Sequence, residues 1–165
     1  MKEYKWLLDK YRRSGVLVDT NILLAYFVGT FDRALIPKFK RTSAFTVEDY
    51  ETIVAVLEFF EIRVTTPNIL TEVSNLTGHL KDDRRGDYMN TFALGMTLLK
   101  EYYTPSQELS EKSVFKKFGL TDASIMTLAK DKYLVFTDDL PLYHYLANNG
   151  IDALNFNHIR MYNWQ

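Results

Sequence analysis

Short runs of apolar and β-branched residues alternate along the chain with longer stretches whose apolar residues recur every three or four positions. A short apolar run bounded by turn residues is typical of a buried strand, whereas the three-or-four spacing is typical of an amphipathic helix. The runs that predict strands lie at residues 16–18, 62–65, 133–137 and 152–156. The pattern therefore predicts a protein in which strands and helices take turns.

The predicted helices occupy the stretches between these runs. Thr46 suits a helix N-cap because Glu48 and Asp49 follow in the first turn, and Pro67 suits the start of the next helix. Thr121 is expected to cap a further helix. Residues 30–45 predict a loop or short irregular segment, and residues around 108–117 predict helical turns. The helices are expected at 4–11, 22–28, 46–60, 68–76, 86–103, 122–130 and 141–148.

This alternation predicts a parallel sheet, because a crossover helix returns the chain to the edge of the sheet where the preceding strand began. We expect an α/β fold in three layers, α/β/α, with a central mostly parallel sheet of four or five short strands. No internal repeat or linker rich in Pro or Gly divides the chain. A single domain is therefore expected over 1–165, with a core over 16–156 and an N-terminal helical extension over 1–15.

Composition narrows the chemistry. The chain of 165 residues is 47% hydrophobic and has no cysteine, which excludes disulfides, thiolate metal sites and a cysteine nucleophile. The net charge of −1 means that any site for nucleic acid must be local. Neither a signal peptide nor an apolar run of membrane-spanning length is recognised, so we expect a soluble, cytoplasmic protein. The isolated His79, His144 and His158 have no metal-ligand spacing and are expected to be surface or interface residues.

Acidic residues follow the ends of the predicted strands. Asp19 follows the first strand, Glu72 lies early in the helix after the second, and Asp138 and Asp139 follow the third. Asp122 lies in the first turn of the helix that leads into that third strand. Because ligands bind outside the carboxyl ends of parallel strands, these side chains are expected to converge at one edge of the sheet.

Convergent carboxylates repel one another and favour a bound cation. A ligand set made only of oxygen suits Mg²⁺ or Mn²⁺, which can supply a nucleophilic water and stabilise the leaving oxygen of a phosphodiester. The pattern therefore predicts phosphodiester hydrolysis.

Each acid also has an ordinary structural interpretation. Asp19 could cap the helix that follows it, and Glu72 could be a solvated helix residue. Asp122 could be favoured only by the helix dipole, and Asp138 and Asp139 could be turn or capping residues. Taken together, these interpretations require four independent coincidences along one edge of the sheet.

Four ordered motifs resemble those of the PIN-domain family of nucleases. The motifs are VLVDTNI at 16–22, TPNILTEVSN at 66–75, GLTDASI at 119–125 and LVFTDD at 134–139. They occur in the family's order and span nearly the whole chain. The resemblance implies metal ligands Asp19, Glu72, Asp122 and Asp139, with Asp138 as the second choice for the fourth acid. The supporting residues that it implies are Thr20, Asn21 and Thr137.

What the resemblance implies is an endoribonuclease that uses one or two Mg²⁺ or Mn²⁺ ions. Many compact members are toxins of toxin–antitoxin pairs, which makes an antitoxin protein a candidate partner beside the RNA substrate, and homodimers are frequent in the family. The alternative is a catalytically idle PIN-like module that binds RNA or a protein. A phosphatase-like hydrolase of the haloacid dehalogenase type would need Asp-x-Asp after the first strand, whereas this chain has Asp19-Thr-Asn21.

Basic clusters could contact an RNA backbone, although such clusters are usually solvated surface. Arg84 and Arg85 are of most interest because they follow the helix that carries Glu72. The candidates for RNA binding are Lys38, Lys40, Arg41, Arg84 and Arg85. Aromatic residues at helical spacing are expected in the core rather than as base-stacking platforms, with Tyr102 and Tyr103 as weak candidates for stacking.

Overall fold

A single five-stranded parallel sheet organises the protein. The structure is a computed structural model that describes residues 4–78, 80 and 82–162, so His79 lies outside the described residues. The strand order is β3-β2-β1-β4-β5, and every neighbouring pair is parallel. The strands are β1 (Val16–Val18), β2 (Arg63–Thr65), β3 (Lys100–Glu101), β4 (Leu134–Thr137) and β5 (Ala153–Asn155).

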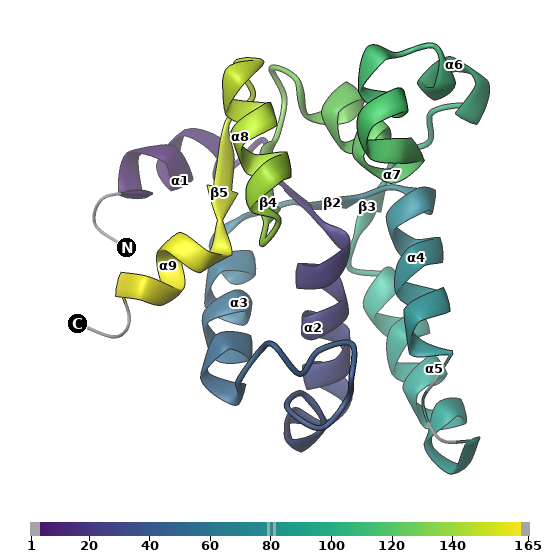
Figure 1. The fold of residues 1–165 in the computed structure, drawn as a ribbon. Helices are drawn as coiled ribbons and strands as arrows, with labels where there is room; N and C mark the ends of the chain where they lie inside the picture. Colours follow the sequence, from purple (N-terminus) through teal and green to yellow (C-terminus); the bar gives the residue numbers. More distant parts are fainter. Residues whose placement is uncertain (1–3, 79, 81, 163–165) are drawn as a thin grey trace.

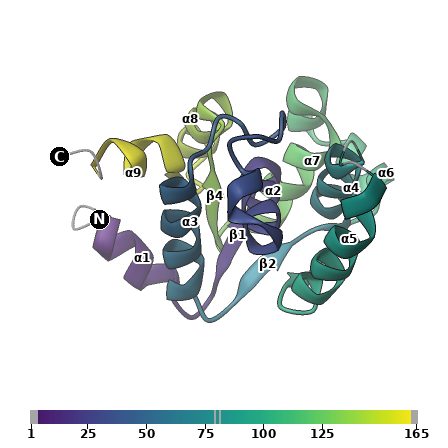
Figure 2. The ribbon, with the colours of Figure 1, turned by 90° about the horizontal axis from the view of Figure 1, so that it is seen from below.

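Helices cover both faces of this sheet and make three layers (Figures 1 and 2). The layer drawn below the sheet in Figure 1 contains α2 to α5, and α7 and α8 lie on the other side. The α-helices are α1 (Lys5–Tyr11), α2 (Thr20–Phe31), α3 (Val47–Phe59), α4 (Pro67–Thr77), α5 (Asp82–Met96), α6 (Ser106–Ser110), α7 (Ser113–Ala129), α8 (Leu140–Asn148) and α9 (Phe156–Tyr162). The expected three-layer α/β/α class with a parallel sheet is confirmed.

The core lies around β1, β4 and α2. All residues of β1 and β4 are buried, as expected for central strands covered on both faces. Helix α2 lies in the middle of its layer and packs against α3, α4 and α5, so its buried residues cover most of its circumference. Gly29 on α2 allows α3 to pack closely, because a Cβ at this position would overlap the Tyr50 ring. The central position of α2 fixes the place of Asp19 at its N-terminus.

One predicted helix extends too far along the chain, and one helix was not predicted. The helix expected over 86–103 ends at Met96, and Lys100–Glu101 forms the edge strand β3. Leu99 and Tyr102 continue the helical spacing, but they are half-buried against the core from outside the helix. The last helix, α9, was not predicted and begins directly at Phe156. In the described part of the chain, no helix is long and apolar enough to cross a membrane.

The predicted start of α3 is confirmed by a full capping box. The Thr46 side chain accepts from the Asp49 N–H, and the Asp49 carboxylate accepts from the Thr46 N–H at 2.8 Å. Asp49 also accepts from the Arg160 guanidinium at 2.7 Å, which ties α9 to this helix start. Pro67 occupies the first turn of α4, also as expected.

The expected cap at Thr121 was wrong, because α7 begins earlier and is interrupted by a kink. Gly119 has φ 84° and ψ −171°, a conformation essentially restricted to glycine. The part of α7 before the kink packs with α6 on a small core of Leu109, Val114 and Ala123. Because the helix restarts after Gly119, Asp122 falls in a first turn, as the sequence predicted.

Gly119→Ala should lower the free energy of unfolding by about 1–3 kcal/mol, because the new Cβ strains this backbone conformation. No atom lies within 4 Å of the position that a Cβ would occupy, so strain alone is expected to act. Gly86→Ala is the matched control, since this exposed glycine of α5 is helical and a Cβ there also meets nothing. The control should gain about 0.5–1 kcal/mol. Urea denaturation measures both, and equal stability of Gly119→Ala and wild type would contradict this account.

Candidate active site

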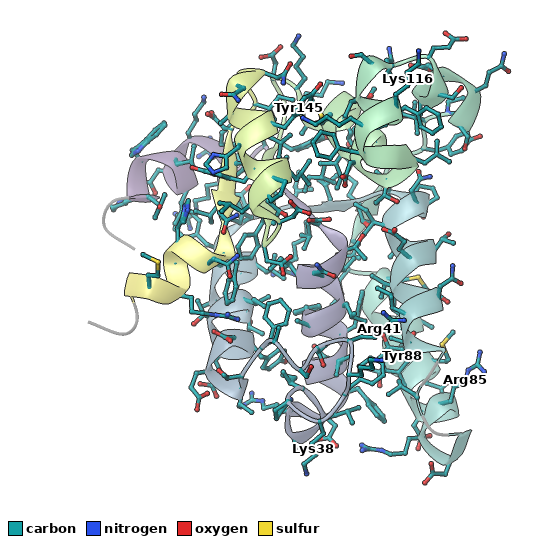
Figure 3. All side chains as sticks on the ribbon, viewed as in Figure 1. Lys38, Arg41, Arg85, Tyr88, Lys116 and Tyr145 are labelled. Atoms are coloured by element: carbon teal, nitrogen blue, oxygen red, sulfur yellow. The ribbon has the colours of Figure 1, made fainter. Side chains whose placement is uncertain are left out.

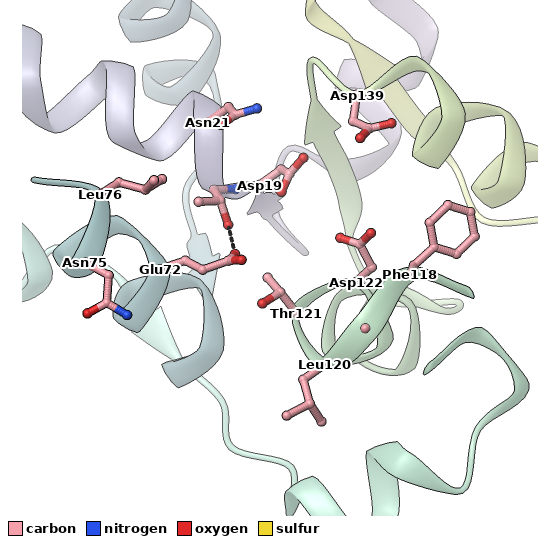
Figure 4. Close-up of a pocket in the computed structure, with 12 residues that line it drawn as sticks. Asp19, Asn21, Glu72, Asn75, Leu76, Phe118, Leu120, Thr121, Asp122 and Asp139 are labelled. Atoms are coloured by element: carbon pink, nitrogen blue, oxygen red, sulfur yellow. Dashed lines mark hydrogen bonds between the residues drawn. The ribbon is translucent and has the colours of Figure 1, made fainter. Parts of the chain in front are cut away.

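The predicted acids meet in a cleft of about 420 Å³ at the carboxyl edge of the sheet (Figure 4). The cleft lies beside the start of α2, the second half of α4 and the kink of α7. Its lining includes Asp19, Glu72, Asp122 and Asp139, and no Lys or Arg is among the residues that line it: Asp19, Thr20, Asn21, Glu72, Asn75, Leu76, Phe118, Gly119, Leu120, Thr121, Asp122 and Asp139. The expected convergence of these four acids on one edge is therefore observed.

Asp19 is the most buried of the four, with 6% of its surface exposed. One carboxylate oxygen accepts from the Thr20 N–H at 2.6 Å, and the other accepts from the Thr137 hydroxyl at 2.5 Å. The pKa of Asp19 is raised to about 6, chiefly by burial and also by the neighbouring Asp138 and Asp139, while these two hydrogen bonds act to lower it. Asp19 is also the N-cap of α2. Asp19 therefore caps α2 and also lines the cleft, so the capping role does not exclude a role in the site.

Glu72 extends from α4 toward α2. Its carboxylate accepts from the Thr20 hydroxyl at 2.8 Å, a hydrogen bond visible in Figure 4. Thr20 thus contacts two acids at once, through its backbone N–H and through its side chain. The resemblance implied that Thr20 supports Asp19, but it did not indicate the contact with Glu72, because a contact between residues 52 positions apart depends on how α2 and α4 pack.

Asp122 faces the same space from the restarted part of α7. The pKa of Asp122 is raised to about 7. Burial is the largest cause, and repulsion from Asp19, Asp139 and Glu72 contributes in that order. Each of the other three acids therefore destabilises the charged form of Asp122. The other three acids therefore lie close enough to Asp122 to act on its charge.

The structure distinguishes between the two acids that follow β4. Asp139 lines the cleft, caps α8 by accepting from the Leu142 N–H at 2.7 Å, and donates its own N–H to Thr137 at 2.9 Å. Asp138 does not line the cleft; burial raises its pKa, and its Oδ1 is buried without a hydrogen-bond partner. The Asn21 side chain hydrogen-bonds Asp138 and lowers that pKa. Asp139 is therefore the better placed fourth acid, and Asn21 acts on Asp138.

The donor chemistry of this cleft fits a hard divalent cation, since carboxylate and hydroxyl oxygens line it and no basic residue neutralises them. Across residues 4–78, 80 and 82–162, however, no three Asp, Glu or His side chains are close enough together to hold one ion. Four carboxylates that face one cleft without a basic residue repel one another. An ion held here would either draw the acids inward or contact some of them through water, as Mg²⁺ commonly does.

Four of the five predicted RNA-binding residues meet in one pocket, and the fifth does not. Lys38, Lys40, Arg41 and Arg84 line a second pocket, away from the acids. Arg85 does not line that pocket and points outward from α5 (Figure 3). Sequence neighbours were thus separated, and residues more than forty positions apart were brought together.

The position of one aromatic side chain beside the acids was not predicted. A smaller cleft shares Glu72, Leu120 and Thr121 with the acid cleft and is also lined by Tyr103. The Tyr103 side chain is 73% exposed. The sequence pattern predicted a helix at Tyr103, whereas the residue lies just after β3, at the same carboxyl edge as the acids.

The two histidines that the structure describes, His144 and His158, contact the Tyr143 ring and line neither cleft.

No family model matches the chain, and no curated protein matches it. The resemblance to the PIN-domain family therefore stays a proposal that rests on the four motifs.

Asp122→Asn should stabilise the protein at neutral pH, because it removes a charge that burial and three acids destabilise. The folded-state pKa of about 7 lies above the ordinary value of 3.8, so folding takes up a proton between these values. Stability from this group is present below about pH 4 and is lost as the pH rises through about 7. We expect the variant to gain roughly 1–3 kcal/mol on wild type over this window, measured by urea denaturation.

Glu58→Gln, on the exposed face of α3, is the matched control for the loss of one carboxylate. Its stability should follow that of wild type across the same pH range. A constant difference between Asp122→Asn and wild type at all pH values would show that the pKa of Asp122 is not raised in the folded protein.

Proposed function

We propose that this chain is a metal-dependent endoribonuclease of the PIN-domain type, which hydrolyses phosphodiester bonds in the acid cleft. One observation carries the proposal: four carboxylates line one cleft without a basic residue, and the pKa values of Asp19 and Asp122 are raised to about 6 and about 7. An arrangement that destabilises the protein in this way is typical of a functional site. The order of the four family motifs supports the same assignment.

In this proposal Asp19, Glu72 and Asp122 hold Mg²⁺ or Mn²⁺, and Asp139 completes the acid set from the α8 side. The ion would supply an acidified water and neutralise charge on the phosphate. Thr137 and Thr20 are positioning residues, because each donates a hydrogen bond to a carboxylate and so limits its rotation. Their hydroxyls leave further lone pairs of both carboxylates free for the ion.

The substrate that we propose is single-stranded RNA. Tyr103 offers an exposed aromatic face in the cleft next to the acids, and unpaired bases stack on such faces. The family resemblance extends the proposal to a toxin of a toxin–antitoxin pair in the cytoplasm, with an antitoxin and a second copy of the chain as candidate partners.

Cleavage of end-labelled total RNA in the presence of Mn²⁺ or Mg²⁺ tests the nuclease directly. Wild type should cleave, EDTA should abolish cleavage, and Asp19→Asn and Asp122→Asn should each reduce the rate by roughly 100-fold or more, because charge stabilisation at the phosphate is lost. Glu58→Gln should cleave at the wild-type rate.

The alternative is an idle module that binds RNA or a protein through the same fold. A thermal melt separates the two. If the cleft holds an ion, Mn²⁺ should raise the melting temperature of wild type and leave that of Asp19→Asn unchanged. Absence of both cleavage and metal-dependent stabilisation in a normally folded protein would reject the nuclease in favour of the idle module.

Tyr103→Ala should weaken binding of single-stranded RNA about 5- to 100-fold, since stacking of one base contributes roughly 1–3 kcal/mol. Tyr103→Phe keeps the aromatic face and should bind as tightly as wild type. Both variants are compared by fluorescence anisotropy in an Asp19→Asn background, so that the RNA stays intact. Equal affinities for the Ala and Phe variants would show that no base stacks there.

A further inference from the structure

A larger pocket, of about 740 Å³, lies at the C-terminal end of α2, opposite the end that carries Asp19. Its cations come from two parts of the chain, because Lys38, Lys40 and Arg41 lie in the turns after Arg33–Leu35 and Arg84 lies on α5. Figure 3 shows Arg41 and Lys38 on the segment that crosses in front of the lower part of α2. We call this pocket the basic pocket; its lining residues are Leu35, Lys38, Phe39, Lys40, Arg41, Leu80, Asp83 and Arg84.

The charge of the basic pocket is mostly uncompensated. Arg84 donates to Asp32 at 2.7 Å and lies 4.8 Å from the centre of the Phe31 ring, which fixes its guanidinium. Within the part of the chain that the structure describes, Lys38, Lys40 and Arg41 form no ion pair. One acid, Asp83, is among the residues that line the pocket. Three cations therefore remain available to an anionic ligand.

The remaining walls of the basic pocket are apolar. Leu35, Phe39 and Leu80 line it beside the cations. A small inorganic anion would gain nothing from such walls, whereas a nucleotide offers a phosphate to the cations and a base and sugar to the apolar side chains. The chemistry of this surface thus favours a nucleic-acid strand.

The basic pocket and the acid cleft are neighbours along α4. Leu76 lines the acid cleft and Leu80 lines the basic pocket, and these residues are four positions apart, roughly one helical turn. The turn continues past the helix end, because the Leu80 N–H donates to the Thr77 carbonyl at 3.0 Å. Helices α2 and α4 run side by side in Figure 1 and pack together. Their shared surface connects the two sites.

The length of α2 sets the separation of the two sites. Asp19 caps the start of this helix of 12 residues and Asp32 caps its end, and the helix between them is roughly 18 Å long. A stacked strand advances about 3.4 Å per nucleotide, so this distance corresponds to about five nucleotides. One strand of modest length can therefore reach both sites.

We propose that the basic pocket anchors the phosphate backbone of the RNA strand about five nucleotides from the bond that lies in the acid cleft. The assignment of that bond rests on the proposed nuclease function, but the anchoring of RNA does not. Lys38, Lys40 and Arg41 bind phosphates. Arg84 is a positioning residue, since its contacts with Asp32 and Phe31 hold α5 against the end of α2.

The test measures binding rather than cleavage. A fluorescent single-stranded RNA of about 12 nucleotides, long enough to span both sites, is titrated with Asp19→Asn protein in EDTA. In this background the combined variant Lys38→Gln, Lys40→Gln, Arg41→Gln is compared with the control Arg13→Gln, Lys130→Gln, Lys132→Gln. The control removes the same charge from exposed residues that precede β1 and β4. These residues lie at the amino ends of the strands, whereas the acid cleft lies at the carboxyl ends.

The variant of the basic pocket should bind about tenfold more weakly or worse near 0.1 M salt, and its dependence of log affinity on log salt should flatten by about 2. The control should stay within about threefold of the parent and keep the parent's salt slope, because bulk charge acts weakly at this ionic strength. Thermal melts of both combined variants should match the parent.

Equal losses in the two combined variants would mean that only net charge matters and would overturn the proposal. Unchanged RNA affinity in the pocket variant, with lost binding of a fluorescent poly-glutamate peptide, would assign the pocket to an acidic protein segment and also overturn it. RNA binding that depends on the pocket in a protein without metal-dependent cleavage would keep the anchor and reject the nuclease. Metal-dependent cleavage by wild type, with the same RNA affinity in the pocket variant and its parent, would keep the nuclease and reject the anchor.

Discussion

Repulsion between carboxylates at the carboxyl edge of the sheet is the constraint on which the candidate site depends. The topology creates it, because β1 and β4 are neighbours in a parallel sheet and Asp19 and Asp139 follow their ends. Burial then strengthens it, as the raised pKa values of Asp19 and Asp122 show. Such a cluster lowers stability, so the buried strands and α2 must offset its cost.

Small polar residues and one glycine hold this arrangement. Thr137 and Thr20 donate to two of the carboxylates, while Gly119 interrupts α7 so that Asp122 starts a new helical segment. The same helix, α2, separates the acids at its beginning from the cations at its end. The packing of α2 thus determines the position of Asp19 in the acid cleft and the distance from that cleft to the anchor that we propose.

Much of this was visible in the sequence because it is local. Strands such as Val16–Val18 are continuous apolar runs, and the acids at their ends follow from the rule for parallel sheets. The edge strand β3 was missed because it has two residues, both exposed, and lacks an apolar run. The position of Tyr103 beside the acids was missed with it, because the sequence pattern predicted a helix there. The meeting of Arg41 with Arg84, and the outward direction of Arg85, depend on tertiary packing that no local pattern records.

The central claim is that the acid cleft is a cation site, and calorimetric titration with Mn²⁺ near pH 6.5 tests it most directly. Because the pKa values of Asp19 and Asp122 are raised to about 6 and about 7, metal binding should displace protons. Wild type should therefore show saturable binding whose heat depends on the ionisation enthalpy of the buffer, and Asp122→Asn should lose it. No saturable heat, or the same isotherm in Asp122→Asn, would contradict the account.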